Sequence, residues 1–177
     1  MTTERKSEEA HHEAGHCVMG YLFGYSLLEV SLKKGRTSIK PVLLGDTNDE
    51  MTKYFIYLLI GSMAADKYAK CEWSFWRFKN LGGKRDFLEL KDLLKNCYKQ
   101  GQRKPILSKA VSEAKNFLNQ DRVWQTIKVS ADKLFRVDEI SGEELNRILE
   151  DELHDYKEKI IETILVDDND DPYEDVM

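Results

Sequence analysis

The sequence lacks a long hydrophobic segment and is poor in cysteine and proline, and these absences exclude several classes of protein. Its 177 residues contain no uninterrupted apolar run of the about 18 residues that a transmembrane helix needs, so we expect no membrane insertion. The N-terminal segment MTTERKSEEAHH is charged rather than apolar, unlike a secretory signal. The three cysteines are an odd number with no close pair. We therefore expect reduced thiols in a cytoplasmic protein.

An excess of one charge is also absent from most of the chain. The net charge of −5 arises because six of the 32 acidic residues lie in the last eleven positions, which contain no lysine or arginine. Residues 1–166 carry 27 basic and 26 acidic residues, so we expect no nucleic-acid surface. Residues 167–177 have too little apolar content to fold alone. We predict one domain over residues 1–166 and an acidic, disordered tail over residues 167–177.

The hydrophobic pattern predicts a mainly α fold with one small β element. Alternation in residues 28–32, a turn at residues 33–36 and an extended run at residues 37–44 indicate a β-hairpin near the N-terminus. Residues 71–84, which include a Gly-Gly pair and four aromatic residues, are expected to be irregular. The periodicity predicts helices over residues 7–23 (capped by Ser7), 49–70, 86–99, 105–136 (with Pro105 in the first turn and a break near 119–121) and 141–164.

One motif in the first predicted helix carries chemistry. His12-Glu13-Ala14-Gly15-His16 matches the pattern HExxH. Residues four apart share a helix face, so His12 and His16 are able to bind one metal ion, and neutral imidazoles suit Zn²⁺. Glu13 lies beside them and is the expected general base, taking a proton from a zinc-bound water. Two half-buried histidines on an amphipathic helix are the simpler alternative.

A catalytic zinc usually takes three protein ligands, so a third donor must come from elsewhere. His11 directly precedes His12 and is expected to point away from the shared face, into solvent. Geometry alone does not choose among the other donors. The candidates for the third ligand are His11, Asp66, Glu72, Asp86, Glu89, Asp92 and His154.

Several segments, in order along the chain, resemble the peptidase domain of FtsH, the membrane-anchored AAA+ zinc metalloprotease. The segment AHHEAGH at residues 10–16 is similar to the family's zinc helix. LLIGSMAAD at residues 58–66 resembles the family's LLGGRxAEE, and LGGKRDF at residues 81–87 resembles its TGAxNDI. ISGEEL at residues 140–145 is similar to its LDGEEL turn. The resemblance spans about residues 7 to 150 and implies a helical metallopeptidase fold with a small β element.

The resemblance also implies a ligand set. The aspartate of the family's TGAxND segment is its third zinc ligand and corresponds to Asp86, so His12, His16 and Asp86 are expected to hold one zinc ion per chain. Ala65 replaces the family's first acidic residue in AEE, which puts the hydrogen-bonded support of a ligand in doubt there. The sequence contains no GxxxxGK[ST] motif, so the family's ATPase module is not expected in this chain. Folded substrates would need a separate unfoldase.

Three functions follow as hypotheses. The first is a zinc metalloendopeptidase that hydrolyses flexible or unfolded polypeptides, with the extended run at residues 37–44 as either a substrate-binding edge or a structural hairpin. The second is a catalytically silent zinc protein that acts as an adaptor or regulator. The third is a metal-free helical interaction module. The sequence sets neither the cleavage preference nor the oligomeric state.

Two further groups of residues lie close to the motif. Cys17 follows His16 but lies about 100° away around the helix, so we expect a small buried hydrophobe rather than a ligand or nucleophile. Trp73, Phe75, Trp76 and Phe78 are expected to pack in the core, with a pocket wall for apolar substrate side chains as the alternative.

Overall fold

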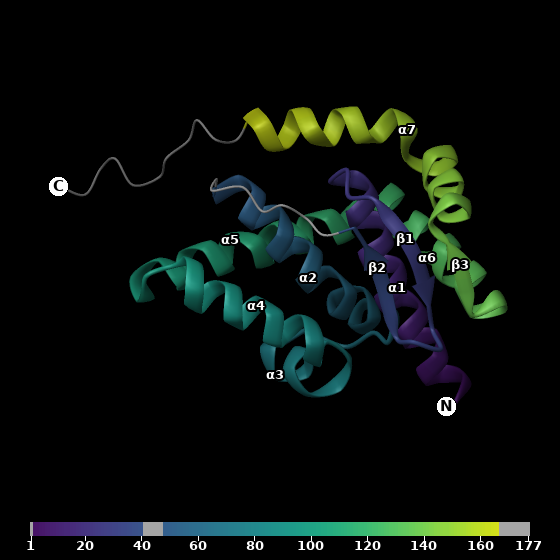
Figure 1. Ribbon diagram of the computed structural model, residues 1–177, viewed down its shortest axis with the longest axis horizontal. Coiled ribbons are helices and arrows are strands. Elements are labelled where there is room, and N and C mark those ends of the chain that lie inside the picture. Colours follow the sequence, from purple (N-terminus) through teal and green to yellow (C-terminus); the bar gives the residue numbers. More distant parts are fainter. Residues whose placement is uncertain (1, 41–47, 167–177) are drawn as a thin grey trace.

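The computed structural model describes residues 2–40 and 48–166, and within them the fold is mainly helical with a small antiparallel sheet (Figure 1). The elements in chain order are α1 (Thr3–Leu22), β1 (Leu27–Ser31), β2 (Arg36–Ile39), α2 (Asn48–Tyr68), α3 (Phe75–Arg77), a π-helical turn (Phe78–Gly82), α4 (Lys84–Cys97), α5 (Gln100–Asn119), α6 (Asp121–Val137), β3 (Glu139–Ser141) and α7 (Gly142–Val166). The predicted mainly α class with a small β element is confirmed. The acidic tail and the predicted extended run beyond Lys40, with Pro41, lie outside the described residues.

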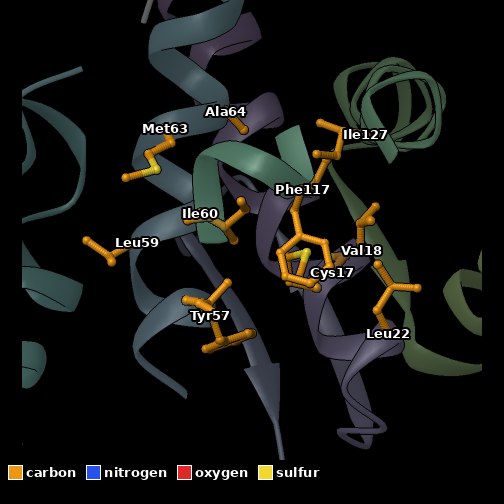
Figure 2. Packing of buried hydrophobic residues seen from close by; sticks show 14 of the residues in the cluster. Cys17, Val18, Leu22, Tyr57, Leu59, Ile60, Met63, Ala64, Phe117 and Ile127 are labelled. Atoms are coloured by element: carbon orange, nitrogen blue, oxygen red, sulfur yellow. The ribbon is translucent and has the colours of Figure 1, made fainter. Parts of the chain in front are cut away.

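Helix α1 is the centre of the fold. It packs against α2 on one side and α6 on the other, and α2 in turn packs against α5. Every residue of α1 from Ala10 to Leu22 is buried, so this part of the helix is surrounded by protein. Figure 2 shows part of the resulting core, to which Val18 of α1, Ile60 of α2 and Ile127 of α6 contribute side chains.

The sheet has the order β2-β1-β3, so β2 forms one edge. Val30 in β1 lies opposite Thr37 in β2 and opposite Ile140 in β3. The third strand was not predicted, because three residues are too few to show an alternating pattern. Helix α7 begins directly after it, and Ser141 caps this helix, since its Oγ accepts a hydrogen bond from the Glu144 amide at 3.3 Å.

Two helix starts differ from the prediction. Helix α1 begins at Thr3 with Thr2 as its cap, whereas Ser7, the predicted cap, lies inside the helix. Helix α5 begins at Gln100, so Pro105 lies within it rather than in its first turn. Pro105 removes the helical partner of the Gly101 carbonyl, and Gly101 is exposed, so water is able to bond that carbonyl instead.

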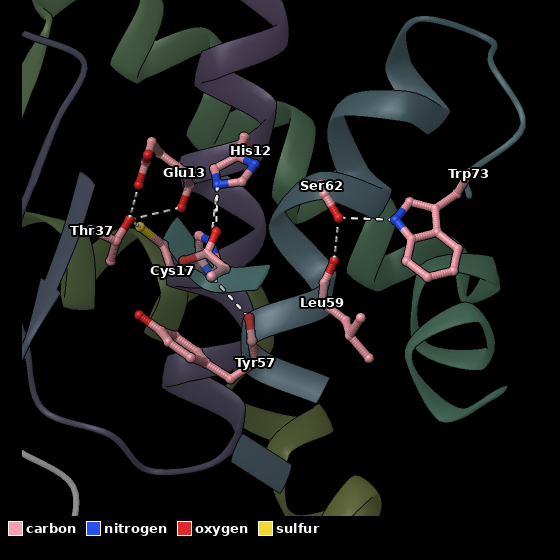
Figure 3. Close-up of polar contacts among 10 residues, drawn as sticks. His12, Glu13, Cys17, Thr37, Tyr57, Leu59, Ser62 and Trp73 are labelled. Carbon is pink, nitrogen blue, oxygen red and sulfur yellow. Dashed lines mark hydrogen bonds and ion pairs between the residues drawn. The ribbon is translucent and has the colours of Figure 1, made fainter. Parts of the chain in front are cut away.

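The segment between α2 and α4 is irregular over residues 71–74, as predicted, but residues 75–82 form α3 and the π-helical turn. Trp73 donates a hydrogen bond from Nε1 to Ser62 Oγ on α2 at 3.0 Å, which ties the segment to that helix (Figure 3). Phe78 is fully buried, and a Cβ on Gly83 would lie 2.3 Å from its ring. Glycine is therefore required where the chain turns into α4. The predicted core packing of the aromatic cluster holds for Phe78 and in part for Trp73, but it is wrong for Phe75 and Trp76, which are 39% and 66% exposed.

Candidate metal centre

His12 and His16 lie on one face of α1, as the spacing of the motif predicts. Their Nε2 atoms are 3.1 Å apart, and both side chains are almost fully buried. Four residues span slightly more than one helical turn, so the two imidazoles stand one above the other and their Nε2 atoms converge.

Asp86 brings a carboxylate to the same point from the first turn of α4. Its Oδ2 atom lies 3.2 Å from His12 Nε2 and 3.3 Å from His16 Nε2. The three predicted ligand residues therefore meet, although α4 is far from α1 in sequence. In the part of the chain that the structure describes, this is the one group of three or more His, Cys, Asp or Glu donors arranged to hold a metal ion.

The spacing of the three donor atoms fits a small divalent ion. Zinc binds nitrogen and oxygen ligands at about 2.0–2.1 Å with tetrahedral angles, which places neighbouring donors about 3.3 Å apart. The observed separations of 3.1, 3.2 and 3.3 Å match this value. A fourth tetrahedral position would remain for a water molecule or a substrate oxygen.

The backbone of α2 fixes the orientation of one imidazole. His16 Nδ1 lies 2.9 Å from the carbonyl oxygen of Tyr57, which accepts hydrogen bonds but cannot donate them (Figure 3). Nδ1 must therefore carry the proton, and the neutral ring presents its Nε2 lone pair to the other donors. Metal-ligating histidines are commonly oriented in this way.

The charges at the site influence one another strongly. Burial opposes the charged form of His12, but its hydrogen bond to Asp86 and the nearby carboxylates of Glu13, Asp86 and Glu9 raise its pKa to about 9. Burial likewise opposes ionisation of Asp86, yet its electrostatic and hydrogen-bonding contacts with His16 and His12 hold the pKa of this carboxyl well below the usual range. The group therefore binds positive charge readily, as a proton or as a metal ion.

The α1–α2 crossing leaves room for the imidazoles only because residue 61 is glycine. A Cβ at Gly61 would lie 2.4 Å from His16 Nε2 and 3.0 Å from His12 Cε1. Sequence reasoning placed Gly61 within a family-like segment but assigned it no role. An isolated glycine inside an apolar helix is the signal that could have found it, since such glycines often mark a close approach.

Glu13 lies beside the donor group and is held by the sheet. Its carboxylate, which is buried, accepts a hydrogen bond from Thr37 Oγ1 at 2.8 Å, and Thr37 also reaches the Glu13 carbonyl at 3.1 Å (Figure 3). Thr37 faces α1 from the edge strand β2. No feature of the sequence indicated this contact, because it depends on how the hairpin packs on α1.

A cavity of about 400 Å³ opens beside these groups. Its lining includes Glu13, the three donor residues and one whole edge of the sheet, residues 35–40. On the opposite wall Tyr54 of α2 donates a hydrogen bond to Glu89 of α4 at 2.5 Å. The candidate base, the donor group and a strand edge thus border one cleft.

A second cavity, of about 620 Å³, borders the other side of the donor group. His12 and Ala65 both line it, and His12 Nδ1 is buried with no hydrogen-bond partner in the described residues. The resemblance had put support in doubt at Ala65, and no group in this part of the chain orients His12 as Tyr57 orients His16. Asp66, also on this wall, accepts hydrogen bonds from Arg77 at 2.8 and 2.9 Å.

The expectation that His11 is exposed is wrong, because Tyr68 of α2 and Trp124 of α6 cover its side of α1. His11 is 5% exposed and stacks on Tyr68 with ring centroids 4.0 Å apart. Its Nδ1 bonds to the Ser7 carbonyl at 2.8 Å, so it does not join the donor group. The remaining candidates are not in the donor group either: Asp66, Glu72, Glu89, Asp92 and His154.

Cys17 is buried, as predicted, and burial raises the pKa of its thiol to about 12. It contacts Thr37 Oγ1 at 3.6 Å rather than the donor group. All three cysteines are free thiols.

No family model matches the sequence, and a search of curated proteins finds no significant match. Among the described residues, no helix is both long enough and apolar enough to cross a bilayer.

Proposed function

We propose that this protein is a zinc-dependent metalloendopeptidase that hydrolyses flexible or unfolded polypeptides, with a fold similar to the FtsH peptidase domain. The observation that carries the proposal is the convergence of His12 Nε2, His16 Nε2 and Asp86 Oδ2 within 3.3 Å of one another. Zinc held there would supply a Lewis acid that polarises a water molecule and the scissile carbonyl.

The remaining roles belong to the chain itself. Glu13 borders the cleft next to the donor group and would accept the proton of the attacking water, then deliver it to the leaving amine. Thr37 holds the Glu13 carboxylate by its hydrogen bond and is a positioning residue. His16 is oriented by the Tyr57 carbonyl, which keeps its Nε2 lone pair available as a ligand.

The edge strand β2 supports a polypeptide as the substrate. Among the described residues it pairs only with β1, and it lines the cleft, so an extended segment is able to add to its other edge through backbone hydrogen bonds. Such a segment must be flexible, because it has to lie extended in the cleft with its backbone groups free, and most backbone groups of a folded chain are already paired. Folded substrates would therefore need an unfoldase that acts before this protein.

A comparison of cleavage by three proteins tests the proposal. We expect the zinc-loaded wild type to degrade casein and to stop when zinc is removed by a chelator. Glu13→Gln should bind one zinc ion per chain but lose turnover by about 10²- to 10⁴-fold, the usual contribution of a general base. Glu4→Gln, an exposed substitution at the start of the same helix, should leave activity unchanged. Casein cleavage that survives in Glu13→Gln would refute the assignment.

One observation favours a second candidate, a zinc protein without hydrolytic activity that acts as an adaptor or regulator. His12 Nδ1 has no partner among the described residues, so it lacks the hydrogen bond that usually orients a catalytic ligand. This candidate predicts stoichiometric zinc but no cleavage of casein by either the wild type or Glu13→Gln.

A further inference from the structure

Three cations line the cleft beside the donor group. Arg36 and Lys40 lie on the edge strand and its continuation, and Arg85 lies on α4 next to Asp86. Within residues 2–40 and 48–166, none of the three takes part in an ion pair. Their charges are therefore available to a ligand in the cleft.

The cleft becomes positively charged once a divalent metal ion is bound. Its described lining also contains three carboxylates, Glu13, Asp86 and Glu89, which offset the three cations. A divalent ion adds two positive charges, so the loaded cleft carries a net charge of +2. Two of the carboxylates are already engaged, Glu13 with Thr37 and Glu89 with Tyr54, whereas the three cations form no ion pair with a described residue.

The strand geometry gives the cations a defined spacing. Arg36 begins β2, and the Lys40 amide extends its pairing by a hydrogen bond to the Ser26 carbonyl at 2.9 Å. Side chains alternate between the faces of a strand, so Arg36 and Lys40 share one face, whereas Thr37 lies on the other, toward Glu13. A segment added to this edge would place residues four apart beside the two cations.

We propose that the cleft selects extended peptide segments with acidic side chains four residues apart, which pair with Arg36 and Lys40. The proposal rests on the proposed function, because it takes the substrate to be a polypeptide added along β2. Arg85 on the opposite wall strengthens the preference for acidic segments without setting their spacing. Neutral flexible segments remain substrates of lower affinity.

Three labelled peptides of equal length test the spacing. One carries two glutamates four residues apart, the second carries two glutamates three residues apart, and the third carries glutamines four apart. The first two have equal charge, but only the first places both acids on one face of a strand. Binding is measured by fluorescence anisotropy to zinc-loaded Glu13→Gln, so hydrolysis does not interfere, and cleavage is measured separately with the wild type.

Each cross-strand ion pair should change affinity by about 1.4- to 5-fold. We therefore expect the four-spaced peptide to bind about 2- to 30-fold more tightly than the glutamine peptide, and up to about 5-fold more tightly than the three-spaced peptide. The preference should weaken at high salt, because these charges are exposed. Adding Arg36→Gln and Lys40→Gln should abolish it. Lys33→Gln with Lys34→Gln, in the turn of the same hairpin, removes the same charge outside the cleft and should preserve it.

Equal affinity for the three peptides would overturn the inference, and so would a spacing preference that survives in the Arg36→Gln, Lys40→Gln variant. Neither result tests the proposed peptidase function. That function fails separately if the zinc-loaded wild type cleaves none of the three peptides, the neutral one included.

Discussion

Gly61→Ala should destroy the metal centre while leaving every proposed ligand in the sequence. Helix propensity alone favours alanine over glycine inside a helix by about 1 kcal/mol, so the substitution would ordinarily stabilise α2. Here the new Cβ would lie 2.4 Å from His16 Nε2, about 1 Å closer than ordinary contact. The imidazole must move, because the helix backbone cannot.

A displacement of this size exceeds what a zinc site tolerates. Ligand distances in real sites lie within about 0.2 Å of their usual values, and weaker perturbations of supporting groups already reduce affinity about 10- to 100-fold. We therefore expect zinc affinity to fall at least about 100-fold, as measured by competition with a chromophoric chelator.

Unfolding measurements offer an independent check. With free zinc at 100 times the wild-type dissociation constant, the wild type should gain about 2.7 kcal/mol in its free energy of unfolding, and a site weakened 100-fold should gain only about 0.4 kcal/mol. Gly101→Ala is the matched control, because a Cβ there meets nothing within 4 Å. It should keep wild-type zinc affinity. Wild-type affinity in Gly61→Ala would show that the imidazoles do not lie where we place them.

Three other results are expected. Asp86→Asn removes the anionic ligand, so zinc affinity in the chelator competition should fall more than about 100-fold; an unchanged affinity would exclude Asp86 from the site. Thr37→Val removes the hydrogen bond to the Glu13 carboxylate, so the unfolding free energy in denaturant should fall by about 1–3 kcal/mol. The variant should retain zinc but have a lower kcat, and an unaltered kcat would argue against a positioning role for Thr37. Cys17 should resist iodoacetamide at pH 8 in the native protein, because burial raises the pKa of its thiol to about 12, whereas the two exposed cysteines should react. Mass spectrometry that shows three modified thiols would contradict the packing of α1.

The local parts of the site were predictable from the sequence. The HExxH spacing sets the relation of His12 and His16, because helix geometry depends on neighbouring residues alone. The helical periodicity likewise predicted α2 and α4 to within two residues at each end.

Pattern and spacing could not predict the parts of the site that depend on tertiary contacts. Asp86 was one of several equivalent donors until the family resemblance selected it, and Thr37 reaches Glu13 only because the hairpin packs on α1. His11 was wrongly expected to be exposed, since its cover comes from Tyr68 and Trp124 on distant helices. A sequence pattern shows which face of a helix is apolar, but it does not show how many other elements pack around that helix.

Zinc K-edge X-ray absorption of the loaded protein tests the central claim most directly. We predict about one zinc ion per chain, with two imidazole ligands and oxygen donors at about 2.0–2.1 Å and no sulfur in the shell. Cys17 adjoins His16 in sequence but contacts Thr37, so it should contribute nothing to the spectrum. A sulfur scatterer at about 2.3 Å, or a protein that retains no zinc, would contradict a centre formed by His12, His16 and Asp86.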